Sequence, residues 1–189
     1  MKHYHVSISI NNGTQPLMQS APLKVRLNLM TNQTPPLLEY LEKKDISFKS
    51  LVHCALEMYV PHPGVETEEK AGEMLRTELL DILSDVNVST LIVAAFRAQE
   101  DAEKGLIPGL TRERFLGRPG LVADELIGIA IATYIGGSKG MFEFVRFDQA
   151  KPGILKRLPP LTNDAIGALV AGASSNVYTR ALKSAGMAP

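Results

Sequence analysis

The spacing of hydrophobic residues changes character about 34 residues into the chain. Over residues 4–10 and 23–29 apolar and polar positions alternate, a period of two that predicts two β-strands joined by a polar loop. A two-stranded ribbon by itself is only marginally stable in water. We therefore expect residues 1–33 to form an accessory arm, a short β-hairpin that packs on the rest of the protein or on a partner chain.

From residue 34 onward the apolar positions recur every three or four residues, which is the spacing of helices that bury one face. Predicted helices cover residues 36–44, 47–60, 66–84, 86–105, 122–135, 139–150 and 163–183, and Thr111 begins one short helical turn. Ser47 is the expected N-cap of the second helix. The sequence thus predicts that residues 34–189 form one all-α domain, a multi-helix bundle.

Charge and composition narrow the classes of function. Twenty Lys and Arg residues balance twenty Asp and Glu residues, so no overall charge attracts nucleic acid or an anionic membrane. No stretch reaches the roughly 18 apolar residues that a transmembrane helix needs, and the N-terminus lacks the pattern of a signal peptide. With Cys54 as the only cysteine no internal disulfide can form, which favours a reducing, cytoplasmic location.

Asp148 and Lys151 lie at the end of a predicted helix that Pro152 and Gly153 terminate. At about 100° per residue, Asp148 shares the side of the helix that carries Phe144, among other apolar residues. A buried carboxylate must be protonated, paired or bound to a metal. Two interpretations remain open for this pair: a structural ion pair three residues apart, or half of an active site.

Three further carboxylates lie in the first turns of apolar helices. Asp124 and Glu125 begin helix 122–135, and Asp164 begins helix 163–183. Each alone is explained by the helix dipole, which favours acidic residues at this end. Four carboxylates beside the three most apolar helices nevertheless indicate a cation. Oxygen ligands without histidine or thiolate partners suit Mg²⁺ or Mn²⁺, and lysine then serves as a point charge on a phosphorylated substrate.

Two loops contain further candidates for phosphate binding. His62 lies between two prolines in "VPHPG", just before a predicted helix start, where anions are favoured; the alternative is a histidine in a surface turn. "GGSKG", at residues 136–140, lacks the spacing of a P-loop. We therefore interpret it as a tight turn between two helices.

Three segments, "DELIGIAIA", "FEFVRFDQAKPGIL" and "NDAIGALVAGASS", occur in an order and at a spacing that resemble the phosphatidylglycerophosphatase A family. "MYVPHPGVET", "ELLDILSDVNV" and "IPGL" make the chain most similar to the soluble branch of that family, which includes archaeal α-ribazole phosphatases. The resemblance extends from Leu37 to Arg180. It implies an all-α bundle of the phosphatidylglycerophosphatase A type that hydrolyses phosphomonoesters with Mg²⁺.

The resemblance also implies roles for individual residues. The acidic pair of the family falls on Asp124 and Glu125, its Asp-x-x-Lys-Pro motif on Asp148, Lys151 and Pro152, and a later acidic position on Asp164. Many members have a second aspartate where this chain has Asn163. The expected metal ligands are therefore Asp124, Glu125, Asp148 and Asp164, which with Lys151 form the expected catalytic set, and the expected substrate-binding residues are His62, Arg146, Lys151 and Asn163.

The sequence leaves three functions to compare. The absence of spanning helices favours a small soluble phosphomonoester, α-ribazole 5′-phosphate of cobalamin synthesis, as the substrate. The alternatives are phosphatidylglycerophosphate of phospholipid synthesis, and a non-catalytic helical module in which Asn163 marks a decayed site. Helices faced with small residues and an unpaired β-ribbon are also compatible with a homodimer.

Overall fold

The structure, a computed structural model, describes residues 34–117 and 121–187. The β-hairpin expected within residues 1–33 lies outside the described residues. The helices that the structure describes belong to the compact unit that spans Pro35–Pro189. Within the described part of the chain no β-strand forms, and an isolated bridge between His62 and Val65 is the nearest approach to one. The predicted all-α class is therefore confirmed for these residues.

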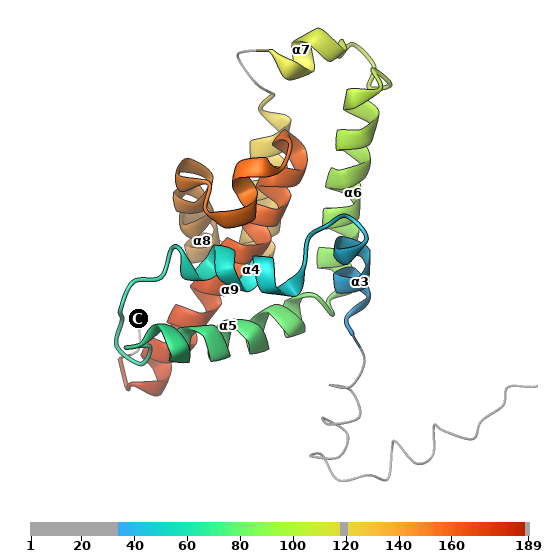
Figure 1. Cartoon of the computed structure of the whole chain (residues 1–189). Coiled ribbons are helices and arrows are strands. Elements are labelled where there is room, and N and C mark those ends of the chain that lie inside the picture. Colours follow the sequence, from blue (N-terminus) through green and yellow to red (C-terminus); the bar gives the residue numbers. More distant parts are fainter. Residues whose placement is uncertain (1–33, 118–120, 188–189) are drawn as a thin grey trace, which may run out of the picture. The chain divides into compact units, whose positions relative to one another are not determined.

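The helices occur close to where the hydrophobic pattern predicts them (Figure 1). Several begin at capping side chains that accept a hydrogen bond from a first-turn N–H: Ser47, Thr67, Asp85 and Thr111. The helices are α3 (Pro36–Glu42), α4 (Phe48–Leu56), α5 (Glu68–Ile82), α6 (Val86–Glu103), α7 (Arg112–Leu116), α8 (Ala123–Ala150), the 3₁₀ helix η1 (Gly153–Arg157) and α9 (Pro160–Ser184).

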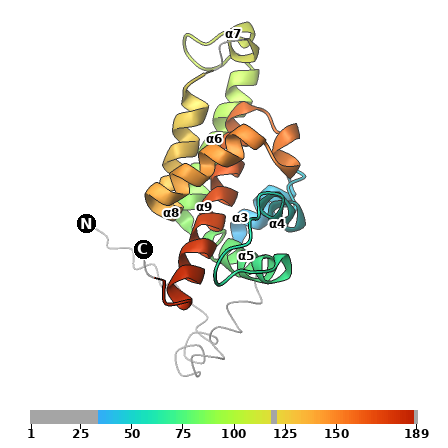
Figure 2. The ribbon, with the colours of Figure 1, turned by 90° about the vertical axis from the view of Figure 1, so that its left-hand side faces the viewer.

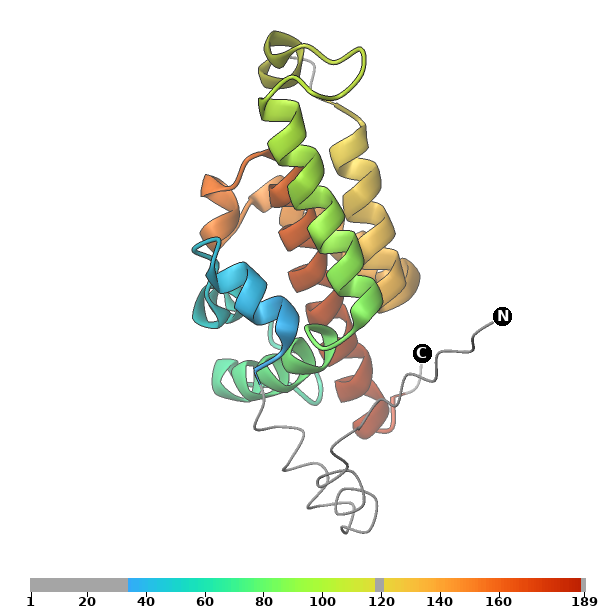
Figure 3. The ribbon, with the colours of Figure 1, turned by 90° about the vertical axis from the view of Figure 1, so that its right-hand side faces the viewer.

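Helix α9 is the centre of the bundle. Almost every residue from Leu161 to Ser175 is buried, and many of these side chains are small, which lets neighbouring helices approach closely. Helices α4, α5, α6 and α8 all contact α9, and α8 does so most extensively. The two side views show α6 and α8 beside the first turns of α9, whose last turns extend beyond them (Figures 2 and 3).

Helix α8 is two helices joined by a sharp turn at Gly137. This glycine has φ 61° and ψ −152°, a conformation that is essentially restricted to glycine. The second half folds back onto the first and packs closely against it. A Cβ at Gly128 would overlap the ring of Phe144, and one at Gly140 would overlap the carbonyl oxygen of Ala132. The interpretation of residues 136–140 as an interhelix turn is thus confirmed.

Among the described helices none alone combines the length and the apolar composition that crossing a bilayer requires. Helices α5 and α6 meet the criteria only when taken together, and they are bent by 84° where they join.

Candidate metal centre

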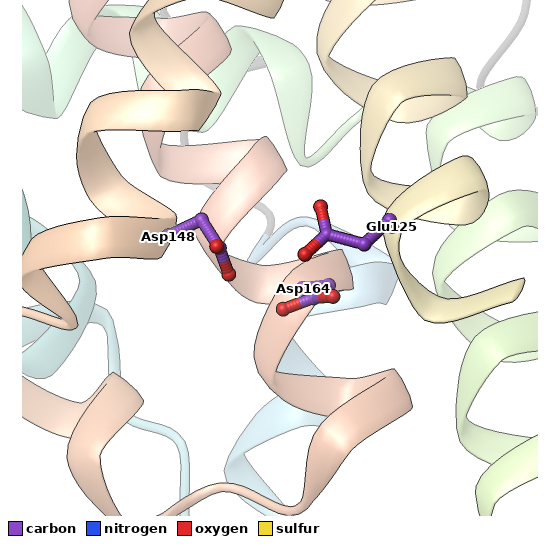
Figure 4. A group of neighbouring side chains, drawn as sticks. All are labelled: Glu125, Asp148 and Asp164. Carbon is purple, nitrogen blue, oxygen red and sulfur yellow. The ribbon is translucent and has the colours of Figure 1, made fainter. Parts of the chain in front are cut away.

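Three carboxylates converge where the ends of α8 meet the start of α9 (Figure 4). Glu125 comes from the first turn of α8, Asp148 from its last turn and Asp164 from the beginning of α9. One oxygen of each side chain lies within 4.8 Å of the corresponding oxygens of the other two. Asp164 is buried, Asp148 is partly buried and Glu125 is exposed, so the group opens to solvent on the side of Glu125.

The turn at Gly137 explains how one helix supplies two of the three side chains. Glu125 precedes Gly137 by twelve residues and Asp148 follows it by eleven. At a rise of about 1.5 Å per residue, each carboxylate lies roughly 17 Å along its half of α8 from the turn. Because the two halves fold back on each other and are nearly equal in length, their far ends lie side by side.

Lys151 completes the group from the residue that ends α8. Its backbone is left-handed, with φ 45° and ψ 55°, and its N–H donates to the carbonyl of Phe147. The ammonium donates hydrogen bonds to Asp148, to Oδ1 of Asn163 at 2.6 Å and to Oδ1 of Asp164 at 3.1 Å. The ion pair with Asp148 therefore exists, but within a group that contains more negative charge than one lysine can neutralise.

Burial and mutual repulsion act on the protonation of these groups. Burial, together with the charges of Asp148 and Asp124, raises the pKa of Asp164 to about 7, although the Lys151 ammonium opposes this rise. Burial, with the charges of Asp148 and Asp124, also raises the pKa of Glu125. Burial lowers the pKa of Lys151, but the bonds and charges of Asp148 and Asp164 outweigh it, so this pKa is raised overall.

This set of donors fits a hard divalent cation. The three converging side chains offer only carboxylate oxygens, which Mg²⁺ and Mn²⁺ prefer. A divalent cation would offset the unfavourable burial of Asp164 and the repulsion among the three carboxylates. Asp124, the fourth expected ligand, is not among the converging residues. Its Oδ1 accepts the N–H of Glu125 at 3.0 Å.

The expected substrate-binding residues separate into two groups. Asn163 is buried beside Lys151, and its amide also donates to the carbonyl of Leu155. Arg146 is exposed on α8 and its guanidinium binds Glu143 at 2.7 Å. The structure thus brings Asn163 to the carboxylates, whereas Arg146 forms its ion pair with Glu143, which is not one of them.

His62 is not brought to the carboxylates at all. Its ring lies 5.3 Å from the ring of Tyr178, which is fourteen residues beyond Asp164 on α9, or about 21 Å along the helix. The next residue but one, Gly64, packs against the backbone of Ala181 in the last turns of α9. This corrects the expectation that His62 and Lys151 bind the same phosphate, because the fold places them towards opposite ends of α9.

Gln99 is a site residue that the pattern along the chain did not single out. It is buried on α6, and its Oε1 accepts the N–H of Leu161 at 3.0 Å. Helix α9 has no side-chain cap of its own at its N-cap, Pro159, so Gln99 satisfies an otherwise free N–H three residues before Asp164. The sequence could have indicated this residue, because Gln99 is a polar residue on the same buried side of the helix as Ala95 and Ala102.

A polar cavity of about 440 Å³ lies between α5, α6, α8 and α9, beside the later turns of α9. Its buried Glu78 pairs with Arg180 at 2.7 Å and accepts a hydrogen bond from Asn176 at 2.8 Å. Asp85 caps α6 and accepts from the hydroxyl of Tyr134. These charged groups satisfy one another, which identifies the cavity wall as a network that joins the helices.

Comparisons with known proteins identify a relative of this chain and solved structures with a similar fold. No model of a known protein family matches the chain. Uncharacterized protein MJ1330 of Methanocaldococcus jannaschii is 37% identical over 118 residues, which are 60% of this chain and 90% of that protein.

A protein of unknown function from Bacillus stearothermophilus has a similar structure, with a TM-score of 0.64 and 22% identity over 79% of this chain and 99% of that one. The low temperature requirement C protein of Listeria monocytogenes is also similar, with a TM-score of 0.63 and 22% identity over 76% of this chain and 96% of that one. At 22% identity these two structures show the fold alone.

Proposed function

The chain belongs to the family of the uncharacterized protein MJ1330, whose name assigns no activity. We therefore propose its function from the site itself: a metal-dependent phosphomonoesterase. One observation supports the proposal above all others. Three carboxylate oxygens within 4.8 Å of one another are joined by a lysine ammonium that contacts two of the same side chains. Hydrolysis of a phosphate monoester is favoured where carboxylates can hold a metal ion next to a protein cation, here the Lys151 ammonium.

In the proposed mechanism Glu125, Asp148 and Asp164 would hold Mg²⁺ or Mn²⁺. When bound, the metal neutralises phosphate oxygens and favours deprotonation of a water molecule. Lys151 donates to a further phosphate oxygen, while Asn163 and Asp164 orient its ammonium. Water attacks phosphorus and the ester P–O bond breaks. Asp124, adjacent to the group but not among its converging oxygens, accepts the proton of the water, and the leaving alkoxide takes a proton from solvent.

The preferred substrate is a small soluble ester, α-ribazole 5′-phosphate, and this choice rests on the resemblance of the sequence to the soluble branch of phosphatidylglycerophosphatase A. A lipid substrate is the second candidate, for a structural reason. The segment between α6 and α8 packs against the start of α9 through Phe115 and Leu161. On and next to it lie exposed apolar side chains, each 60% exposed or more, which could contact an acyl chain: Leu106, Leu116, Val122 and Leu126.

The deciding measurement is release of inorganic phosphate from α-ribazole 5′-phosphate and from phosphatidylglycerophosphate in detergent micelles. Each is assayed with EDTA, with Mg²⁺ and with Mn²⁺. We expect turnover of one ester that depends on a divalent cation and is abolished by EDTA. Absence of turnover of both esters with every cation would favour the non-catalytic module, in which the carboxylates and Lys151 only support packing.

Lys151→Met is expected to lower phosphate release by at least about 100-fold, because it removes a preorganised donor to the phosphate. Lys139→Met, which removes an exposed lysine from the same helix, serves as the matched control and should retain full activity. Steady-state kinetics at saturating Mg²⁺ measure both variants. Full activity of Lys151→Met would remove the lysine from the mechanism and leave it as a structural ion pair.

A further inference from the structure

The backbone immediately after Lys151 is bound by α4, a helix that contributes no carboxylate to the group. The thiol of Cys54 donates to the carbonyl of Pro152 at 3.3 Å. A carboxylate oxygen of Glu57, Oε2, accepts the N–H of Gly153 at 3.0 Å. Cys54 of α4 and Glu57, the residue that follows this helix, thus bind two consecutive residues after Lys151.

The shape of this turn leaves little freedom for Lys151 to move. Gly153 has φ +52°, and a Cβ there would lie 3.1 Å from the Cα of Cys54, so the turn is in close contact with α4. Lys151 itself has φ 45°, which is unfavourable for a residue with a side chain and is further restricted by the following proline. Such a conformation persists only where the surroundings fix it.

Lys151 is therefore held from two directions. On one side its ammonium is bound by Asp148, Asn163 and Asp164. On the other side its peptide continues into the turn that Cys54 and Glu57 hold. Burial raises the pKa of the Cys54 thiol to about 12, in keeping with its role as a neutral donor.

We propose that Glu57, assisted by Cys54, is a positioning residue that fixes the Lys151 ammonium between Asp148 and Asp164. The inference rests on the proposed function for its kinetic consequence, but its structural content is independent of activity. A side chain outside the carboxylate group then determines how well a phosphate is bound at the moment of reaction.

Glu57 has two other partners, and both can be removed separately. Its Oε1 lies 3.1 Å from Nε2 of His53, and its Oε2 lies 3.9 Å from Nζ of Lys156. His53→Gln and Lys156→Met disturb these ion pairs but keep the acceptor for Gly153. Glu57→Gln keeps a carbonyl oxygen for Gly153 but removes the charge, and Glu57→Ala removes the acceptor.

The test compares these four variants with the wild-type protein by phosphate-release kinetics and by ¹H–¹⁵N NMR of the Gly153 amide and the Lys151 ammonium. We expect Glu57→Ala to lower kcat by about 10- to 100-fold, since small displacements of positioned groups have effects of this size. Its Gly153 amide should exchange faster with solvent, and its Lys151 ammonium signal should shift. Glu57→Gln, His53→Gln and Lys156→Met should resemble the wild type in all three measurements.

The outcomes separate failure of this inference from failure of the proposed function. If the wild type is active and Glu57→Ala keeps its kcat, or if Glu57→Gln is impaired as much as Glu57→Ala, the positioning role is refuted and the phosphatase stands. If the wild type hydrolyses neither ester, the proposed function fails, and the NMR signals alone decide the positioning. An unchanged Lys151 ammonium signal in Glu57→Ala would then refute it. Cys54→Ala and Cys54→Ser, which remove and retain a donor to Pro152, repeat the comparison at a buried position.

Discussion

Asp164→Asn is expected to abolish hydrolysis while making the metal-free protein more stable at pH 8. Asp164 is one of the three converging ligands, so its loss should remove cation binding and, with it, activity by at least about 100-fold. The asparagine keeps an oxygen that can accept the hydrogen bond of Lys151. If a substitution abolishes activity but raises the free energy of unfolding, the original residue serves function rather than folding.

The gain in stability follows from the raised pKa of Asp164. Its usual value is 3.8 and burial raises it to about 7 in the folded protein, so the folded state binds the proton more tightly than the unfolded state. The aspartate therefore lowers the free energy of unfolding progressively as pH rises from about 4 to 7, and by up to about 4 kcal/mol above pH 7. Asparagine removes this penalty. At pH 5 the difference between variant and wild type should shrink to roughly 1–2 kcal/mol.

Urea unfolding in EDTA at pH 5 and pH 8 measures this difference, and the shift in melting temperature on adding Mg²⁺ or Mn²⁺ measures cation binding. Asp101→Asn, at an exposed position on α6, is the matched control and should alter neither quantity. If Asp164→Asn lowers the free energy of unfolding at pH 8, the aspartate acts as a structural partner of Lys151 instead.

Gly137→Ala is expected to lower the free energy of unfolding by about 2–3 kcal/mol and to weaken cation binding. The residue has φ 61° and ψ −152°, which an alanine adopts only under strain. No atom lies within 4 Å of the position of its Cβ, so the effect comes from the backbone and not from a steric clash. Any relaxation of the turn would move the two halves of α8 apart and separate Glu125 from Asp148.

Gly105→Ala provides the comparison for this hinge variant. Gly105 also has a positive φ, +68°, with open space at its Cβ, but it ends α6 away from the turn. We expect a loss of about 1 kcal/mol there and unchanged cation affinity. Chemical unfolding and isothermal titration with Mn²⁺ measure both variants, and equal cation affinity in Gly137→Ala and the wild type would show that the turn does not determine the position of the ligands.

The sequence predicted most of the helices and the residue types of the site, because both depend on local patterns. Apolar spacing located the two halves of α8, and the glycines between them identified the turn. Helical projection placed Asp148 near the buried side of α8, and the structure finds it partly buried beside Phe144, which is fully buried. At about 100° per residue Val145 also falls on the side of Asp148, but its side chain is 45% exposed.

Features that depend on tertiary packing were not predictable from local patterns. Asp124 and Glu125 are adjacent carboxylates, but they point about 100° apart on the helix. Only the direction of the second half of α8 decides that Glu125, and not Asp124, meets Asp148. His62 resembled a phosphate ligand in sequence, but its loop packs on Tyr178, near the far end of α9. Glu57 lies on a helix edge with no pattern to distinguish it, and its contact with Gly153 spans 96 residues.

The fold-back of α8 also bears on how the chain assembles this group of like charges. Glu125, Asp148 and Asp164 all lie within one continuous segment of forty residues, so the chain closes only short loops to bring them together. The entropy of loop closure grows slowly with length, and helices that are already formed shorten the free chain further. The main opposition to assembly is therefore electrostatic rather than conformational. It follows that salt and divalent cations, more than chain length, should control how readily this part of the protein reaches its native arrangement.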